Sequence, residues 1–333
     1  MINLHAVFLK KAAGLIIYFF WVGLWLLGLG LVLWYPLRWW PGDKLLPVQL
    51  INYFMPWLLL ALIPAIIIAG LANRPGLIAL LTLPTLFIIF SYAPLFLPRS
   101  NMVLADSGRI KVMSYNIWGR NHNMRSVAAI IHREQPDILL LQEAYSHLSD
   151  SLMEELTRLY PDQELYYTFT PGAGQAIISR FPLSPQGTSY EQGRAQKAIV
   201  HTPNGDILVW NVHLKQPRYW SSQYDQMVLL EQAIAAVDQP LIVGGDFNTT
   251  DQSEIYHMIN QHLDNSHWEA GWGFGFSYPA NKPTINGVTI PTPMIRIDHI
   301  FHSRHFYAYD AKTLSTNGGS DHFPVVADLS LTR

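Results

Sequence analysis

Six short polar segments in the C-terminal two-thirds of the 333-residue chain each follow or interrupt an apolar run. They are residues 113–116, 140–143, 210–214, 244–248, 296–299 and 319–324. Together they offer carboxylates, carboxamides and histidines but no thiolate, because the chain has no cysteine. Hard oxygen ligands of this kind suit Mg²⁺ or Mn²⁺. Hydrolysis of a phosphate ester needs such a cation to neutralise charge and a positioned group to orient water.

Each of these residues, taken singly, has a plain structural interpretation. Asp246 follows a glycine pair, which is typical of a turn. Asn116 and Asn248 could each satisfy a nearby backbone group, and a strand histidine such as His213 is usually packed. Glu143 is the best candidate for a metal ligand on its residue type and place alone. The occurrence of all six segments in one order is what favours a catalytic site.

Alternating strand and helix patterns surround the six segments. Apolar runs predict strands at 110–117, 137–141, 175–179, 198–202, 207–213, 240–244, 296–302 and 325–330. Periodic runs predict helices at 124–134, 149–160, 219–237 and 253–260. Residues 268–293 are rich in glycine, proline and aromatic residues and predict a long loop. This alternation indicates an α/β domain whose polar segments gather at strand ends.

The six segments in this order resemble the signatures of the endonuclease/exonuclease/phosphatase superfamily. That superfamily includes apurinic endonucleases, pancreatic-type deoxyribonucleases, neutral sphingomyelinases and inositol-polyphosphate 5-phosphatases. The resemblance covers residues 109–331, the whole polar part of the chain. It implies a two-sheet β-sandwich flanked by helices, four layers in all, and a hydrolase that acts on phosphate ester bonds.

The resemblance also implies roles for the metal and water site. Asn116 and Asp321 would join Glu143 as ligands of Mg²⁺ or Mn²⁺, directly or through water. Asp246 matches the carboxylate that activates the attacking water. Asn248 would help to hold that water or the phosphate. Whether one or two metal ions act stays open at this point.

A second group of residues is expected at the phosphate. His322 would hydrogen-bond the scissile phosphate, and Asp298 would orient it and favour its imidazolium form. His213 matches the histidine that contacts the phosphate or assists the leaving group. A basic residue near the strand after the third segment would bind phosphate, with Arg194 and Lys197 as candidates. Either Asp246 or His322 could be the formal base.

The first 98 residues have a composition typical of a segment that contacts lipid rather than water. Residues 12–37, 45–73 and 75–98 contain no charged side chain. These runs predict transmembrane helices at about 13–35, 53–71 and 76–97. A cleaved signal peptide before a buried apolar domain would explain only the first run. We therefore expect a membrane anchor at 1–98, a linker at 99–108 and a catalytic domain at 109–333.

The flanking charges give an expected orientation. Lys10 and Lys11 precede the first span, and Arg74 lies in the loop between the second and third. The positive-inside rule places all three in the cytoplasm. Three spans then put the catalytic domain on the extracytoplasmic side of a bacterial inner or plasma membrane, as part of a multi-pass protein.

Charge and aromatic content bear on the substrate. The first 98 residues carry five basic and one acidic residue, which leaves 17 basic and 23 acidic residues, a net charge of −6, for the rest. Domains that grip long nucleic acids are usually basic. The aromatic side chains of 268–293 can stack on bases, enter a bilayer interface or pack over a sheet edge.

We therefore expect a membrane-anchored, metal-dependent phosphodiesterase or phosphatase whose substrate is lipid-linked or a small phosphodiester. An extracytoplasmic nuclease is the alternative, with nucleic acid as its partner. A non-catalytic sensor or scaffold that retains the fold is a second alternative. Besides the substrate, the lipid bilayer is the expected partner, and the sequence indicates no protein partner.

Overall fold

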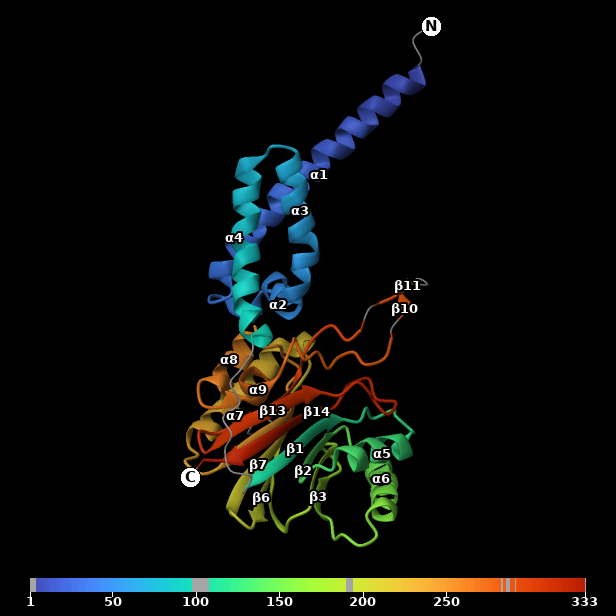
Figure 1. Ribbon diagram of the computed structural model, residues 1–333, viewed down its shortest axis with the longest axis vertical. Coiled ribbons are helices and arrows are strands. Elements are labelled where there is room, and N and C mark those ends of the chain that lie inside the picture. The colour runs from blue at the N-terminus through green and yellow to red at the C-terminus, as the bar shows by residue number, and fades with distance from the viewer. Residues whose placement is uncertain are drawn as a thin grey trace. The chain divides into compact units, whose positions relative to one another are not determined.

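The computed structural model describes residues 4–97, 108–189, 194–282, 284–285, 288–290 and 292–332. The chain divides into two compact units, Met1–Pro94 and Leu95–Arg333 (Figure 1). Of the predicted linker 99–108, only Gly108 lies within the described residues.

The N-terminal unit is helical. Its helices are α1 (Leu4–Leu37), α2 (Leu46–Phe54), α3 (Leu59–Leu71) and α4 (Pro75–Tyr92), with short 3₁₀ turns η1 (Gly42–Lys44), η2 (Met55–Leu58) and η3 (Ala93–Phe96). Three stretches are long and apolar enough to cross a membrane: Phe8–Leu37, Leu46–Leu71 and Pro75–Phe96. Most large apolar side chains on α1 are exposed. Such exposure is costly in water and is what a helix that faces lipid would show.

The first sheet of the C-terminal unit has the strand order β13-β14-β1-β2-β4-β3. Its strands are β1 (Arg109–Asn116), β2 (Ile138–Gln142), β3 (Tyr166–Thr170), β4 (Gln175–Ser179), β13 (Phe306–Thr313) and β14 (Val325–Leu331). Strands β1 and β2 are parallel, and the other neighbouring pairs are antiparallel. Helices α5 (Met124–Glu134) and α6 (Ser146–Leu159) pack on its outer face.

The second sheet has the order β5-β6-β7-β8-β12-β9. Its strands are β5 (Leu183–Ser189), β6 (Ala195–Thr202), β7 (Gly205–His213), β8 (Leu241–Asp246), β9 (Asp264–Asn265) and β12 (Asp298–His302). Only β7 and β8 pair in parallel among its described strands. The turn η4 (Pro217–Tyr219) leads into α7 (Trp220–Ala235), which covers the outer face with α8 (Glu254–Asn260). The short helix α9 (Ser266–Ala270) follows β9, and β10 (Thr284–Ile285) pairs with β11 (Val288–Thr289) apart from both sheets.

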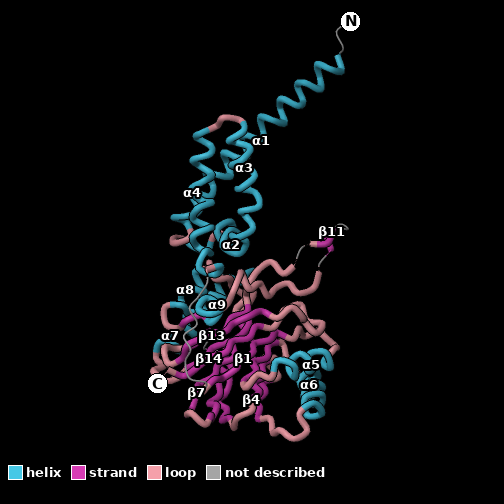
Figure 2. The backbone as a smooth tube through the Cα atoms, in the orientation of Figure 1, coloured by secondary structure: helices cyan, strands magenta, loops and turns pink. Residues whose placement is uncertain are grey.

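Side-chain alternation along the strands builds the four layers, with the strands gathered between the helices (Figure 2). In β1, Val112 points into the core between the two sheets, whereas Met113 packs in the cluster beneath α5 and α6. In β8, Ile242 joins the central core, and Val243 packs with α7 and α8. Successive strand residues face opposite sides of a sheet, so an unbroken apolar run is what a sheet covered on both faces requires. The predicted two-sheet sandwich flanked by helices is confirmed.

Some element predictions needed correction. The helix predicted from residue 149 begins three residues earlier, at Ser146. The predicted loop 268–293 begins inside α9, because the Asn265 side chain accepts hydrogen bonds from two backbone N–H groups of that helix's first turn. Strands β3, β5, β9 and β13 were not predicted. They lie at or near sheet edges, where a one-sided or interrupted apolar pattern gives a weak signal.

Candidate active site

Strand register brings three predicted site residues side by side. His213 lies opposite Asp246 across the parallel pair β7–β8, and Asp298 lies opposite Asp246 across the antiparallel pair β8–β12. Residues in register on neighbouring strands have their side chains on the same face of the sheet. In the first sheet, Asn116 ends β1 opposite the end of β2, and Glu143 follows β2 directly. Both sheets therefore contribute strand ends to one site.

The backbone at the site is strained. Glu143, Arg194 and Asn248 have φ values of 57°, 52° and 49°, in the left-handed region that non-glycine residues rarely adopt. Such conformations cost roughly 1–3 kcal/mol each and persist where surrounding contacts hold them, often at active sites. Gly245 has φ 153°, and a Cβ atom there would lie 1.9 Å from the carbonyl oxygen of Val212. Only glycine lets β8 approach β7 closely enough to set Asp246 in register.

Asp246 lies at the centre of the polar cluster. Its Oδ2 accepts hydrogen bonds from Asn116 Nδ2 at 3.0 Å and Asn248 Nδ2 at 3.2 Å, and its Oδ1 accepts the backbone N–H of Asn248 at 2.9 Å. The Nε2 atoms of His213 and His322 lie 3.7 and 3.8 Å from the same Oδ2. Burial raises the pKa of Asp246 to about 7, against the lowering effect of the His322 charge. A carboxylate with a pKa near neutrality is matched to accept a proton from water.

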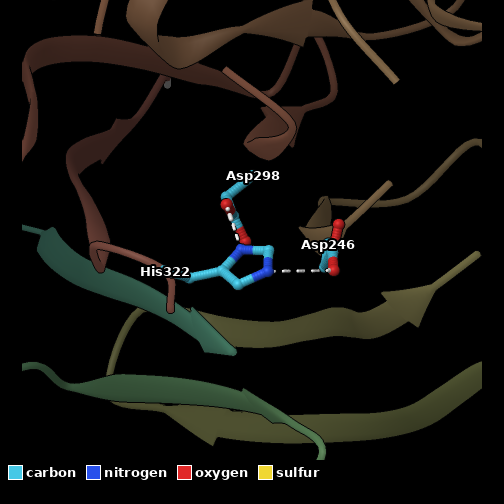
Figure 3. Close-up of side chains that lie close together, drawn as sticks. All are labelled: Asp246, Asp298 and His322. Atoms are coloured by element: carbon cyan, nitrogen blue, oxygen red, sulfur yellow. Dashed lines mark hydrogen bonds and ion pairs between the residues drawn. The ribbon is translucent and has the colours of Figure 1, made fainter. Parts of the chain in front are cut away.

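The two histidines beside Asp246 differ in charge. His322 Nδ1 donates to Asp298 Oδ2 at 2.8 Å, and both side chains are buried (Figure 3). Burial alone lowers the pKa of His322, but the charges of Asp298 and Asp246 outweigh it and raise that pKa to about 10. The enclosed position of His213 lowers its pKa to about 4. At neutral pH one histidine is therefore an imidazolium and the other a neutral imidazole.

The predicted metal ligands show the features of a site for a hard cation. Glu143 Oε2 accepts the backbone N–H of Gly119 at 2.6 Å, and Glu143 Oε1 lies 3.4 Å from Asn116 Nδ2. Asp321 Oδ1 is buried without a hydrogen-bond partner among the described residues. Burial raises the pKa of Asp321, the imidazolium of His322 opposes this, and the nearby charge of Glu143 adds to it. Converging carboxylates with an unpartnered oxygen are stabilised by a divalent cation.

Two features qualify this ligand set. Asn116 Oδ1 accepts the backbone N–H of Trp118 at 3.0 Å and Asn116 Nδ2 donates to Asp246, so one lone pair of Oδ1 is left for a cation or a water. Ligand atoms of Asp246, Asp298 and His322 lie within 4.8 Å of one another and could also hold an ion. In that group, however, the neighbouring carboxylates keep His322 protonated, and an imidazolium has no lone pair to offer a metal. The oxygen set around Glu143 and Asp321 fits Mg²⁺ or Mn²⁺ better.

The two candidates for binding phosphate, Arg194 and Lys197, have different surroundings. The Lys197 ammonium lies 3.8 Å from the centre of the Trp210 ring, in the layer that α7 and α8 cover. Arg194 precedes β6, and its charge is one of the causes that lower the pKa of His213, so the two side chains are close enough to interact. Arg194 is therefore the phosphate-binding candidate that the structure places near the other site residues.

Sequence reasoning did not single out two residues that support the site. Ser277 Oγ donates to Asp298 Oδ2 at 2.6 Å, the same oxygen that His322 contacts. The Tyr278 ring centre lies 4.8 Å from that of His322. Both belong to the predicted loop 268–293. They are far in sequence from Asp298 and His322, so no local pattern indicated that they contact these residues. Beneath the site, Gln142 Nε2 donates to Asn211 Oδ1 at 2.7 Å, which joins the two sheets through buried amides.

Comparisons with known proteins bear on the family and the fold. A sequence model described as the Endonuclease/Exonuclease/phosphatase family matches residues 113–322. No curated protein matches the chain. A family protein from Bacteroides thetaiotaomicron has a similar structure, at 18% identity and TM-score 0.55, covering 68% of this chain and 98% of its own.

Two further structures are similar at the same level. A mannosyl-6-phosphatase of Bacteroides thetaiotaomicron matches at 18% identity and TM-score 0.54, covering 67% of this chain and 100% of its own. An endonuclease/exonuclease/phosphatase family protein of Leptotrichia buccalis gives the same four values. At this identity the structural likeness shows the fold, and the sequence model shows the family. The chain belongs to the endonuclease/exonuclease/phosphatase family, with three N-terminal helical stretches that support a membrane-anchored form.

Proposed function

We propose that this protein is a multi-pass membrane enzyme that hydrolyses phosphate esters with Mg²⁺ or Mn²⁺, with its catalytic domain outside the cytoplasm. The observation that carries the proposal is the buried Asp246 carboxylate, flanked by a neutral His213 and a charged His322. An acid, a base and a phosphate-binding cation are the groups that water-mediated phosphoryl transfer needs. The family match supports a hydrolase of this class.

The proposed roles follow from these contacts. Asp246 accepts a proton from the attacking water, and the Asn248 carboxamide beside it holds that water or a phosphate oxygen. His322 donates a hydrogen bond from Nε2 to the phosphate, because its Nδ1 is held by Asp298. His213 lies across Asp246 from His322 and contacts the phosphate or the leaving oxygen. The His322–Asp298 pair makes Asp246 the better candidate for the formal base, since an imidazolium has no free lone pair.

The charged groups around the phosphate complete the proposal. Glu143 and Asp321 hold the metal ion, with Asn116 beside them, and Arg194 binds a phosphate oxygen. The bound cation neutralises charge on the phosphoryl group. Without it, buried carboxylates would repel an anionic substrate.

Metal binding and turnover, measured in one series, test this proposal. The full-length chain in detergent is assayed with bis-p-nitrophenyl phosphate, p-nitrophenyl phosphate, a sugar phosphate and double-stranded DNA, with Mn²⁺ and then with EDTA. Glu143→Gln should raise the Mn²⁺ concentration for half-maximal rate about tenfold or more, as loss of a charged ligand does. The matched variant Glu154→Gln, on the exposed side of α6, should leave it unchanged.

The outcomes separate the possibilities. Equal metal dependence in both variants would contradict the ligand assignment. Preferred hydrolysis of DNA would favour the extracytoplasmic nuclease. Turnover that EDTA leaves unchanged, or no turnover on any of the four substrates, would contradict the proposed reaction and favour the sensor or scaffold.

A further inference from the structure

The segment between α9 and β12 carries a cluster of aromatic side chains. We call residues 271–278 the aromatic loop. Trp272 is 66% exposed, more than any other large apolar side chain in the described part of Leu95–Arg333. The rings of Phe274 and Phe276 stack with centres 5.0 Å apart. No charged residue occurs between Glu269 and Lys282, so the loop carries aromatic rings and no charged side chain.

The aromatic loop is attached to the end of the third apolar stretch. Leu95 and Phe96 belong to the same compact unit as the loop. The backbone N–H of Gly273 donates to the carbonyl oxygen of Leu95 at 2.9 Å. The Phe96 ring lies 6.1 Å from Trp272 and 5.0 Å from Phe274, centre to centre. Phe96 is also the last residue of the stretch Pro75–Phe96, which is long and apolar enough to cross a membrane.

This attachment has a consequence for the loop's surroundings. The end of a membrane-spanning helix lies in the interfacial region, where tryptophan and other aromatic residues are enriched. A loop bonded to that end is held in or beside the same region. An exposed tryptophan is costly in water but favourable in a lipid interface.

The aromatic loop is equally close to the catalytic groups. Its last two residues, Ser277 and Tyr278, contact Asp298 and His322, respectively. Phe274 and Tyr278 are four residues apart, a reach of about 14 Å at most for an extended chain. The reacting phosphate and the membrane interface therefore lie within the span of one short loop.

We propose that the aromatic loop is an interfacial membrane-binding element, and that the enzyme takes its phosphate ester from the headgroup of a lipid in the bilayer. The substrate part of this inference rests on the proposed phosphoesterase function, whereas the membrane contact does not. The lipid headgroup supplies the phosphate, and the apolar rings supply the affinity for the surface that holds it. A water-soluble phosphate ester without an apolar or aromatic group would gain nothing from these rings.

The position of the loop is measured first. Because the chain has no cysteine, Trp272→Cys in the full-length protein gives a single site for a nitroxide label. The protein is reconstituted into vesicles of phosphatidylethanolamine and phosphatidylglycerol, and label accessibility to oxygen and to a water-soluble nickel chelate is compared. Tyr167→Cys, on β3 and 52% exposed, is the matched control. The label at 272 should favour oxygen and the control should favour the nickel chelate. Equal, water-like accessibility at both sites would overturn the membrane contact.

The substrate is tested with two lipids that share one headgroup. Dioleoyl phosphatidic acid stays in the vesicle, whereas dihexanoyl phosphatidic acid dissolves in water. Trp272→Ser should lower kcat/KM for the dioleoyl lipid about tenfold or more, the effect expected for losing one buried aromatic anchor. Its kcat/KM for the dihexanoyl lipid and for bis-p-nitrophenyl phosphate should stay within about twofold of wild type.

The results distinguish failure of the lipid substrate from failure of the proposed reaction. Metal-dependent hydrolysis of bis-p-nitrophenyl phosphate, with equal effects of Trp272→Ser on both lipids, would overturn the lipid substrate and leave the proposed reaction standing. Absence of metal-dependent hydrolysis on every probe would overturn the reaction and the lipid substrate together. The accessibility of the nitroxide label would then be the sole test of the membrane contact.

Discussion

Replacing Asp298 by asparagine removes one negative charge from the buried pair with His322 and keeps the side-chain size. The Nδ1–Oδ2 distance is 2.8 Å, so at an effective dielectric constant near 20 the attraction is about 6 kcal/mol. Burial disfavours the charged form of His322. Among the neighbouring charges, that of Asp298 does most to offset this effect. Loss of that attraction should lower the pKa of His322 from about 10 toward neutrality, where burial again outweighs the remaining charges. A larger fraction of the variant then carries a neutral imidazole at neutral and alkaline pH.

The expected result is a lower kcat with a new pH dependence. A neutral His322 stabilises phosphate charge poorly, so kcat at neutral pH should fall about a hundredfold to a thousandfold. The remaining activity should rise as pH falls, because protonation restores the imidazolium. Initial rates on bis-p-nitrophenyl phosphate at saturating Mn²⁺, from acid to alkaline pH, measure both effects.

Ser277→Ala provides the matched control for Asp298→Asn. It removes the hydrogen bond to Asp298 Oδ2 and keeps the charge, so kcat should fall by less than about tenfold. If Asp298→Asn keeps the wild-type kcat and pH profile, the imidazolium role of His322 is wrong. If both variants lose activity equally, geometry rather than charge is what Asp298 supplies.

Three further predictions concern the fold and the wall of the site. Gly245→Ala forces a Cβ atom against a β7 carbonyl oxygen and should destabilise the C-terminal unit by more than about 4 kcal/mol in urea unfolding, whereas Gly205→Ala, also at positive φ but with open space, should cost about 1 kcal/mol or little more. Burial lowers the pKa of His299 from 6.5 to about 3, so the contribution of His299 makes the free energy of unfolding fall by up to about 1.4 kcal/mol per pH unit below about pH 6.5 and is constant above it. His299→Gln should flatten that slope in acid, and an unchanged slope would contradict the assignment. Tyr278→Phe should keep kcat within about twofold and Tyr278→Ala should lower it about tenfold, since the ring rather than the hydroxyl packs on the catalytic imidazole; equal losses would assign the effect to the hydroxyl.

The sequence predicts much of the fold because the sheets are covered on both faces. Strands such as β2 and β8 are continuous apolar runs that end in polar residues, and this makes both the strand and the site visible. The family match then confirms the superfamily that the polar segments indicate. Strand β3 is half-buried or exposed along its whole length, and β13 mixes buried residues with exposed polar ones, so the apolar pattern of both strands is less distinct.

Only part of the candidate site can be predicted from the sequence. Asp246 and Asp298 are 52 positions apart, yet register places them opposite each other, which no local pattern reveals. The choice between Arg194 and Lys197 depends on the face of β6 that Lys197 occupies and on the backbone of Arg194, which precedes β6 at a positive φ that sequence does not indicate. Ser277 was missed for the same reason, because its role exists only through contact with a distant carboxylate.

The most direct test of the proposed chemistry is hydrolysis of bis-p-nitrophenyl phosphate by the full-length protein with Mg²⁺ or Mn²⁺ and then with EDTA. The test compares wild type, Asp246→Ala and the matched control Asp238→Ala, whose side chain is 83% exposed. We predict metal-dependent turnover in wild type and the control, and its loss in Asp246→Ala while the domain stays folded. Metal-dependent turnover that persists in Asp246→Ala would contradict the proposed site.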